Sequence, residues 1–254
     1  MVIKISPLIV TRILCIFFLS ITLLSTVPES SYGANEEIEG LKRIAKRYYW
    51  GNGPKKNLAK ALQLYLRAAA LGDADAQFIS GGMYYKGLGV EKNLPEAFRY
   101  LYMAAENGRS SAKSEKIIAE SYMTGLGTLK NYDEAIRWYT IAAEHGSAEA
   151  KNSLGYIYYL GNGVEQDTAE AATYFLAAAT DGLAVAQYNV GILYYTGRGF
   201  GVTDIVKSYS WMNLAAGNGH QPAIPARDYL ETVLSTEELT MAQEYSKKNS
   251  PPES

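Results

Sequence analysis

The two histidines are the first residues to consider for chemistry, and their spacing argues against a shared site. His145 and His220 lie about two copies of a repeated pattern apart, so both rings would have to converge with carboxylates over a long distance to bind a metal. Each stands beside a glycine that closes a predicted helix, where a cation suits the helix dipole. We therefore predict no metal site and no cofactor.

A serine nucleophile is the second possibility. The segment from Ser110 to Lys113 reads Ser-Ser-Ala-Lys and fits the S-x-x-K pattern of some serine hydrolases. Neither S-D-N nor K-T-G accompanies it, and serine and lysine at this spacing are common in helices. We predict that the chain is not an enzyme; a cell-wall-active or weakly β-lactamase-like hydrolase remains an alternative.

The glycines could suggest a phosphate-binding loop, but they recur too regularly. A Gly-x-Gly pair begins, at steps of 36, 38, 36 and 36 residues, at Gly51, Gly87, Gly125, Gly161 and Gly197. No strand pattern precedes the pairs, and neither GxGxxG nor GK[ST] occurs. The recurrence predicts a turn between helices.

Further fixed positions show that the whole unit repeats. Three residues before each Gly-x-Gly pair stands a tyrosine: Tyr48, Tyr84, Tyr122, Tyr158 and Tyr194. A second glycine, preceded by an Ala-Ala pair, closes each unit: Gly72, Gly108, Gly146, Gly182 and Gly219. The pattern predicts five helix–turn–helix repeats at 35–72, 73–108, 109–146, 147–182 and 183–220, which must stack because one repeat cannot bury its own apolar face.

Polar residues mark where the second helix of each repeat should begin. Asn or Asp precedes the helical pattern at Asn57, Asn93, Asn131, Asp167 and Asp204, and these side chains can accept hydrogen bonds from free backbone amides. Glu96, Glu134 and Glu170 follow three residues later and predict capping boxes. The first helix of the first repeat is expected to begin at Asn35.

The third repeat and the C-terminal segment depart from the pattern. The third repeat has two extra residues between Gly108 and Gly125 and a more polar first helix. After the last repeat, Pro222 and Pro225 predict a break before a short helix at 228–234. Ser235 then predicts the start of a polar helix, so we assign 221–246 as a helical cap and 247–254 as a disordered tail.

The repeated unit resembles the Sel-one-like repeat, a relative of the tetratricopeptide repeat. Ala150 to Val164 (AKNSLGYIYYLGNGV) matches the family pattern nearly residue by residue, and the resemblance covers about residues 36 to 219. It implies an all-α, right-handed solenoid whose first helices line a concave, protein-binding groove. It also implies a link to envelope regulation or host contact, as in exported bacterial members. The third repeat lacks the Leu-Gly pair and departs most from the pattern.

A second set of aromatic residues predicts where a partner binds. The residue after each recurring tyrosine is Tyr49, Tyr85, Tyr159 or Tyr195, with Met123 in the third repeat, and Trp50 follows in the first. Tyrosine and tryptophan are frequent interface anchors, so we predict partner-binding residues Tyr49, Trp50, Tyr85, Tyr159 and Tyr195. The alternative is that these rings pack between repeats. Lys42, Arg43, Lys46 and Arg47 form a basic face, either solvated or in contact with an acidic partner.

Residues 1–34 have the organisation of a secretory signal peptide. Lys4 and Arg12 precede an uncharged run of 15 residues at 13–27, and the small residues Gly33 and Ala34 follow. The run is shorter than the ~20 residues that a membrane-spanning helix needs. We predict cleavage after Gly33 or Ala34; an uncleaved N-terminal anchor is the alternative and would be the only membrane attachment.

Composition limits the function further. Cys15, the only cysteine, lies within this run, so the mature chain would have no disulfide and no thiolate site. The formal net charge of −2 gives no attraction to nucleic acid. We predict a periplasmic or secreted scaffold for a protein or peptide partner, with a secreted factor that engages a host protein as an alternative.

Overall fold

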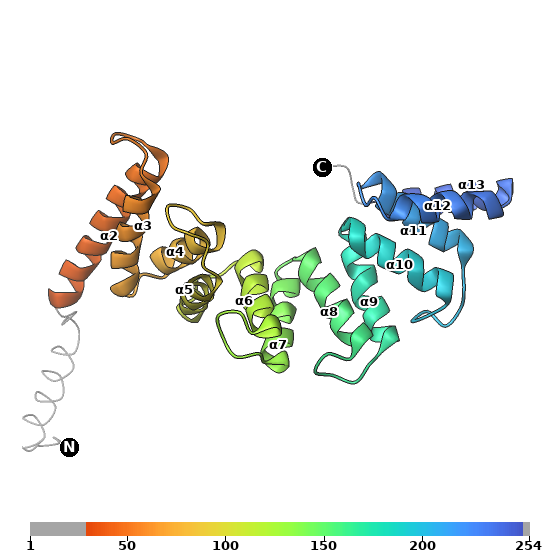
Figure 1. Ribbon diagram of the computed structural model, residues 1–254, viewed down its shortest axis with the longest axis horizontal. Helices are drawn as coiled ribbons and strands as arrows, with labels where there is room; N and C mark the ends of the chain where they lie inside the picture. The colour runs from red at the N-terminus through yellow and green to blue at the C-terminus, as the bar shows by residue number, and fades with distance from the viewer. Residues whose placement is uncertain (1–28, 251–254) are drawn as a thin grey trace, which may run out of the picture.

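The computed structural model describes residues 29–250, and in this range the chain is a curved row of paired helices (Figure 1). The first helices of the five repeats are α2 (Glu29–Trp50), α4 (Ala74–Lys86), α6 (Ala112–Thr124), α8 (Ala148–Leu160) and α10 (Ala184–Thr196). The second helices are α3 (Leu58–Ala70), α5 (Leu94–Glu106), α7 (Tyr132–Glu144), α9 (Thr168–Thr180) and α11 (Ile205–Gly217). Helices α12 (Ala223–Val233) and α13 (Thr236–Asn249) follow. The predicted all-α solenoid with a C-terminal helical cap is confirmed.

The predicted N-caps of the second helices are confirmed. The Oδ1 atom of Asn131, for example, accepts a hydrogen bond from the backbone amide of Glu134 at 3.1 Å. The predicted capping boxes are wrong. The carboxylates of Glu96 and Glu134 bind Arg99 and Arg137 one turn further along, at 2.6 and 2.8 Å, because a cation at i+3 offers a charge-assisted bond.

Small residues allow the two helices of a repeat to approach closely. An ideal Cβ atom at Gly155 of α8 would lie 2.7 Å from Cδ1 of Phe175 in α9. Gly81 faces Leu101 with the same clearance, and Gly191 faces Met212. After α8 the chain reverses through Gly161, whose φ of 71° lies in the left-handed region that glycine adopts without strain.

In each of the last four repeats, a pair of polar side chains joins the start of the first helix to the end of the second. In each, the fourth residue of the first helix binds the residue that follows the second helix, and we call this the clasp pair. The four clasp pairs, with their shortest distances, are Gln77–Asn107 (2.9 Å), Glu115–His145 (2.8 Å), Lys151–Asp181 (2.5 Å) and Gln187–Asn218 (2.9 Å). The first repeat has Leu41 and Leu71 at these positions.

The third repeat is regular in its helices and irregular in its turn. Helix α6 has 13 residues, as α4, α8 and α10 have, and the two extra residues precede it as Arg109 and Ser110. Nε of Arg109 donates to Asp75 of the preceding repeat at 2.7 Å, and its guanidinium lies 4.5 Å from the Phe78 ring centroid. The insertion therefore adds a contact between repeats.

The ends of the chain differ from the sequence-based boundaries. Helix α2 begins at Glu29 rather than Asn35, and no proline between Glu29 and Trp50 interrupts it. The predicted signal peptide thus overlaps the start of α2, and its residues 1–28 lie outside the described range.

The C-terminal cap also extends beyond its predicted limits. Helix α12 begins at Ala223, because Pro222 and Pro225 occupy the N-cap and first turn, where a missing amide is tolerated. Helix α13 continues to Asn249, so the predicted tail is helical at 247–249, while 251–254 are not described. The hydroxyl of Ser246 donates to the carbonyl of Ser210 in α11 at 3.2 Å, and this contact ties α13 to the last repeat.

Candidate functional site

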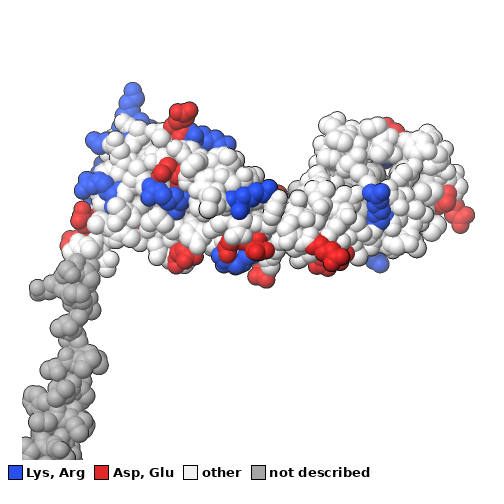
Figure 2. Space-filling model, turned by 60° about the horizontal axis from the view of Figure 1, so that its bottom comes forward, with Lys and Arg blue, Asp and Glu red and all other residues white. Residues whose placement is uncertain are grey.

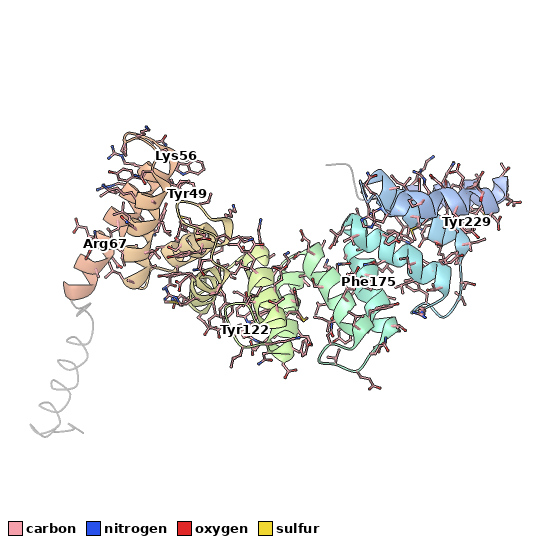
Figure 3. All side chains as sticks on the ribbon, in the orientation of Figure 1. Tyr49, Lys56, Arg67, Tyr122, Phe175 and Tyr229 are labelled. Atoms are coloured by element: carbon pink, nitrogen blue, oxygen red, sulfur yellow. The ribbon has the colours of Figure 1, made fainter. Side chains whose placement is uncertain are left out.

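Three hollows follow the same face of the solenoid, each between neighbouring first helices or between α10 and α12. The largest, about 890 Å³, lies between α2 and α4 with Tyr65 of α3 among its lining residues, and we call it the first groove. A hollow of about 120 Å³ lies between α8 and α10 around Phe175. A third of about 220 Å³ lies between α10 and α12 beside Tyr229 (Figure 3). The hollows are equivalent, because Tyr65, Phe175 and Met212 occupy the same repeat position in them.

The structure separates the five predicted partner-binding residues. Tyr49 and Trp50 both line the first groove, with ring centroids 5.0 Å apart. Tyr159 lines the second hollow and Tyr195 the third, whereas Tyr85 packs against the core beneath Lys92, whose Nζ lies 5.4 Å from its ring centroid. Only the first repeat therefore brings two of the predicted anchors together.

Exposure distinguishes Trp50 from the other anchors. Its side chain is 62% exposed, although tryptophan has a large apolar area to bury. Tyr49 is partly buried against the core of the first repeats, and it also lines the first groove. Tyr49 lies at the same end of the first repeat as Lys56, and Arg67 lies at the opposite end (Figure 3).

The first groove also contains an ion-pair network that the sequence did not reveal. Nζ of Lys42 lies 3.0 Å from Glu39 and 3.1 Å from Asp73. Partial burial alone would lower the pKa of Lys42, but hydrogen bonds to these two carboxylates outweigh it and raise the pKa. The hydrogen bond from Arg109 lowers the pKa of Asp75, so this carboxylate stays ionised. Lys42 and Asp75 are therefore both charged at neutral pH.

The second hollow has no charged side chain among its lining residues, and its polar groups come from Tyr156, Tyr159 and Asn189. Nδ2 of Asn189 in α10 donates to Oδ1 of Asn152 in α8 at 3.1 Å, and the hydroxyl of Tyr156 donates to Oδ1 of Asn189 at 3.2 Å. The sequence pattern did not indicate Asn152, Tyr156 and Asn189, because each of these residue types occurs in only one of the five repeats at its position. Comparing the same helix position across the five repeats, Lys46, Gly82, Glu120, Tyr156 and Ile192, would have shown which copies differ.

The candidates for chemistry are engaged in structural contacts. The hydroxyl of Ser110 donates to Glu115 at 2.6 Å, and no hydrogen bond joins Ser110 to Lys113 among the described residues. His145 binds the same carboxylate, and His220 packs against Tyr188 with ring centroids 4.9 Å apart. Across residues 29–250, no cluster of three or more metal-type side chains is present. The same range has no helix long and apolar enough to cross a membrane.

The repeat architecture agrees with the comparison to known families. The model of the Sel1 repeat matches residues 38–73, 74–108, 117–147, 148–183 and 184–220. The chain belongs to the Sel1 repeat family. Sel1 repeats generally serve as scaffolds for protein–protein interaction, and their third match here begins at residue 117, after the two-residue insertion.

Solved structures of Sel1 repeat proteins are among those similar to this chain. A Sel1 repeat protein from Oxalobacter formigenes is 34% identical, with 83% of this chain and 87% of that chain covered and a TM-score of 0.62. A putative Sel1 repeat protein from Klebsiella pneumoniae is 20% identical, with 80% and 98% covered and a TM-score of 0.42. A comparison with curated protein sequences found no match.

Proposed function

We propose that this Sel1 repeat chain is an exported scaffold that holds a protein or peptide partner along its groove face, in the bacterial envelope or outside the cell. The observation that carries the proposal is the first groove, an open hollow of about 890 Å³ with an exposed tryptophan at its edge. Open, aromatic-lined grooves on rigid repeats favour extended ligands, because the scaffold is already ordered before binding.

Export is supported by the order of charged, apolar and small residues in the first 34 positions. The N-terminal sequence of protein recovered from outside the cytoplasm should begin near Ala34 or Asn35. Recovery of protein with an intact N-terminus at Met1 would support the membrane-anchored alternative. Cell fractionation separates the remaining alternatives, since accumulation in culture supernatant favours a host-directed factor and retention in the periplasm favours an envelope role.

Mild crosslinking of the mature chain in its own cells, followed by affinity purification, tests the scaffold role. We expect one or more proteins to be crosslinked to the wild type and lost from Tyr49→Ala/Trp50→Ala, a change in the first groove. Leu126→Ala/Leu129→Ala, which shortens two exposed apolar side chains in the turn after α6 that line none of the three hollows, is the matched control. If the wild type captures no protein above the level of untagged cells, the scaffold proposal is wrong.

A hydrolytic function receives no support from the geometry. The hydroxyl of Ser110 is hydrogen-bonded to the carboxylate of Glu115, which also binds His145, and among the described residues no hydrogen bond joins His145 to the serine oxygen as a general base would need. Turnover of a chromogenic β-lactam or of peptidoglycan fragments that is lost in Ser110→Ala would overturn this assignment.

A further inference from the structure

Charge is distributed unevenly along the chain. Residues 35–72 hold eight basic and three acidic side chains, a net charge of +5, whereas residues 73–254 hold 14 basic and 22 acidic side chains, a net charge of −8. Lysine and arginine side chains gather over the N-terminal end of the solenoid, and the C-terminal half shows few charges in the same view (Figure 2). The first repeat is therefore a local positive region on a protein whose overall charge is slightly negative.

The first groove concentrates this positive charge beside its aromatic residues. Arg43 and Lys46 line the groove from α2, and both are exposed. Within residues 29–250, neither makes an ion pair, whereas the neighbouring Lys42 is held by Glu39, Asp73 and Asp75. Arg43 and Lys46 can therefore bind a ligand without breaking an ion pair within the described residues.

The acidic residues that line the groove do not pair with Arg43 or Lys46. Glu39 and Asp75 are bound by Lys42, and Asp75 also by Arg109. Glu36 also lines the groove, but it precedes Lys46 by ten residues on the same helix, a rise of about 15 Å. The groove is thus negative near Glu36 and positive near Lys46 and Trp50, which gives a bound acidic segment a preferred direction.

The repeat fold does not require these two cations. The residues at the position of Arg43 in the later repeats are Ile79, Ile117, Ser153 and Asn189, and those at the position of Lys46 are Gly82, Glu120, Tyr156 and Ile192. All five repeats form the same helix pair with these different residues. Among the five repeats only the first has basic residues at both positions, so packing of the repeats does not account for them.

We propose that the first groove binds an acidic segment of the partner protein, extended along α2. Its carboxylates bind Arg43 and Lys46, and one aromatic or aliphatic side chain packs against Tyr49, Trp50 and Tyr65. Arginine suits this role because its planar guanidinium can hold a carboxylate with two hydrogen bonds, and the aromatic rings supply the apolar contact. This inference rests on the proposed scaffold function and assigns the chemistry of the partner.

Selection from a random 12-residue peptide display library on the immobilised mature chain tests the proposal. We expect the enriched peptides to combine two or more Asp or Glu residues with an aromatic or leucine residue. Fluorescence anisotropy with one enriched peptide should then show affinity about tenfold weaker, or more, for Arg43→Glu/Lys46→Glu. The same peptide with Asn and Gln in place of Asp and Glu should bind the wild type with a similar loss.

The matched control is Lys55→Glu/Lys56→Glu, which makes the same change in net charge in the exposed turn of the same repeat. We expect this variant to bind within about threefold of the wild type at 0.15 M salt, where charges beyond ~8 Å are screened. An equal loss in both variants would mean a diffuse positive field, and enrichment of non-acidic peptides would mean a different ligand. Either result overturns the proposal.

Two further measurements separate this inference from its alternatives. Sedimentation with phosphatidylcholine vesicles, with and without phosphatidylglycerol, tests an anionic lipid surface as the ligand. Binding to the anionic vesicles that is lost in Arg43→Glu/Lys46→Glu, without enrichment of acidic peptides, would overturn the peptide proposal. If the crosslinked partner is retained by this variant, the scaffold function stands and the acidic-segment inference fails.

Discussion

Glu115 of α6 and His145 at the end of α7 are 30 residues apart in sequence, and Nδ1 of His145 lies 2.8 Å from Oε2 of Glu115. The glutamate side chain is only 1% exposed, whereas the histidine side chain is 57% exposed. A buried carboxylate needs a hydrogen-bonding or charged partner, so His145 contributes to the fold of the third repeat through Glu115. The Ser110 hydroxyl, from the insertion of this repeat, supplies a second bond.

The clasp pairs predict that Glu115 and His145 can be exchanged only together. His145→Ala should lower the free energy of unfolding by about 1–3 kcal/mol, because Glu115 loses a partner while staying buried. The double variant Glu115→Gln/His145→Asn recreates the Gln77–Asn107 pair of the second repeat and should recover most of this loss. Urea unfolding followed by circular dichroism measures both, and a double variant no more stable than His145→Ala would contradict the clasp.

The sequence was sufficient for the repeat frame because each frame position is dictated by local chemistry. The caps at Asn57 and Asn131 and the left-handed glycine at Gly161 each depend on residues within a few positions. The capping boxes did not form, because the carboxylates of Glu96 and Glu134 bind Arg99 and Arg137 instead. Capping propensity alone does not say which of two possible partners a glutamate binds.

The candidate site could be predicted only in part. Tyr49 and Trp50 follow from comparing the repeats. The groove is also lined by Tyr65 of α3, and this contribution from the second helix is not visible in the periodic pattern of the first helix. Within the described chain, Arg43 and Lys46 make no ion pair, while the carboxylates of Asp73 and Asp75 are bound by Lys42 and Arg109. Such competition is decided by contacts between residues about 30 positions apart, which the sequence pattern does not specify.

Two glycines inside helices predict opposite effects of the same substitution. An ideal Cβ atom at Gly82 meets nothing within 4 Å, so Gly82→Ala should raise the free energy of unfolding by about 1 kcal/mol through helix propensity. At Gly155 the Cβ atom would lie 2.7 Å from Phe175, and overpacking of about 1–3 kcal/mol should outweigh that gain. Thermal unfolding of the two variants checks this, and a Gly155→Ala protein more stable than the wild type would refute the close helix contact.

The glycine that closes the third repeat predicts a cost from backbone conformation alone. Gly146 has a φ of 89°, and an ideal Cβ atom there meets nothing within 4 Å. Gly146→Val should therefore destabilise the fold by more than about 1 kcal/mol, because a β-branched residue resists positive φ. Gly146→Asn should cost less, since asparagine tolerates this region. Equal melting temperatures for the wild type and Gly146→Val would show that the turn does not need glycine.

The last prediction concerns Tyr139, which lies in the core between α6 and α8 and is 4% exposed. Burial, reinforced by the charge of Glu120, raises the pKa of Tyr139 from 10.0 to about 12. Below pH 10 the phenol is protonated in the folded and unfolded chains, so its contribution to stability is fully present. Between pH 10 and about 12 the unfolded chain releases its proton first, and stability falls as pH rises.

The loss attributable to Tyr139 should be on the order of 2–3 kcal/mol by pH 12, since one pKa unit corresponds to ~1.4 kcal/mol. Urea unfolding at intervals from about pH 9 to 12 measures it, and Tyr139→Phe should fall less steeply than the wild type over this range, because phenylalanine has no proton to release. Tyr229→Phe is the control, because Tyr229 is 57% exposed, and it should retain the wild-type slope. A Tyr139→Phe slope equal to that of the wild type would mean that the phenol is not held protonated by the fold.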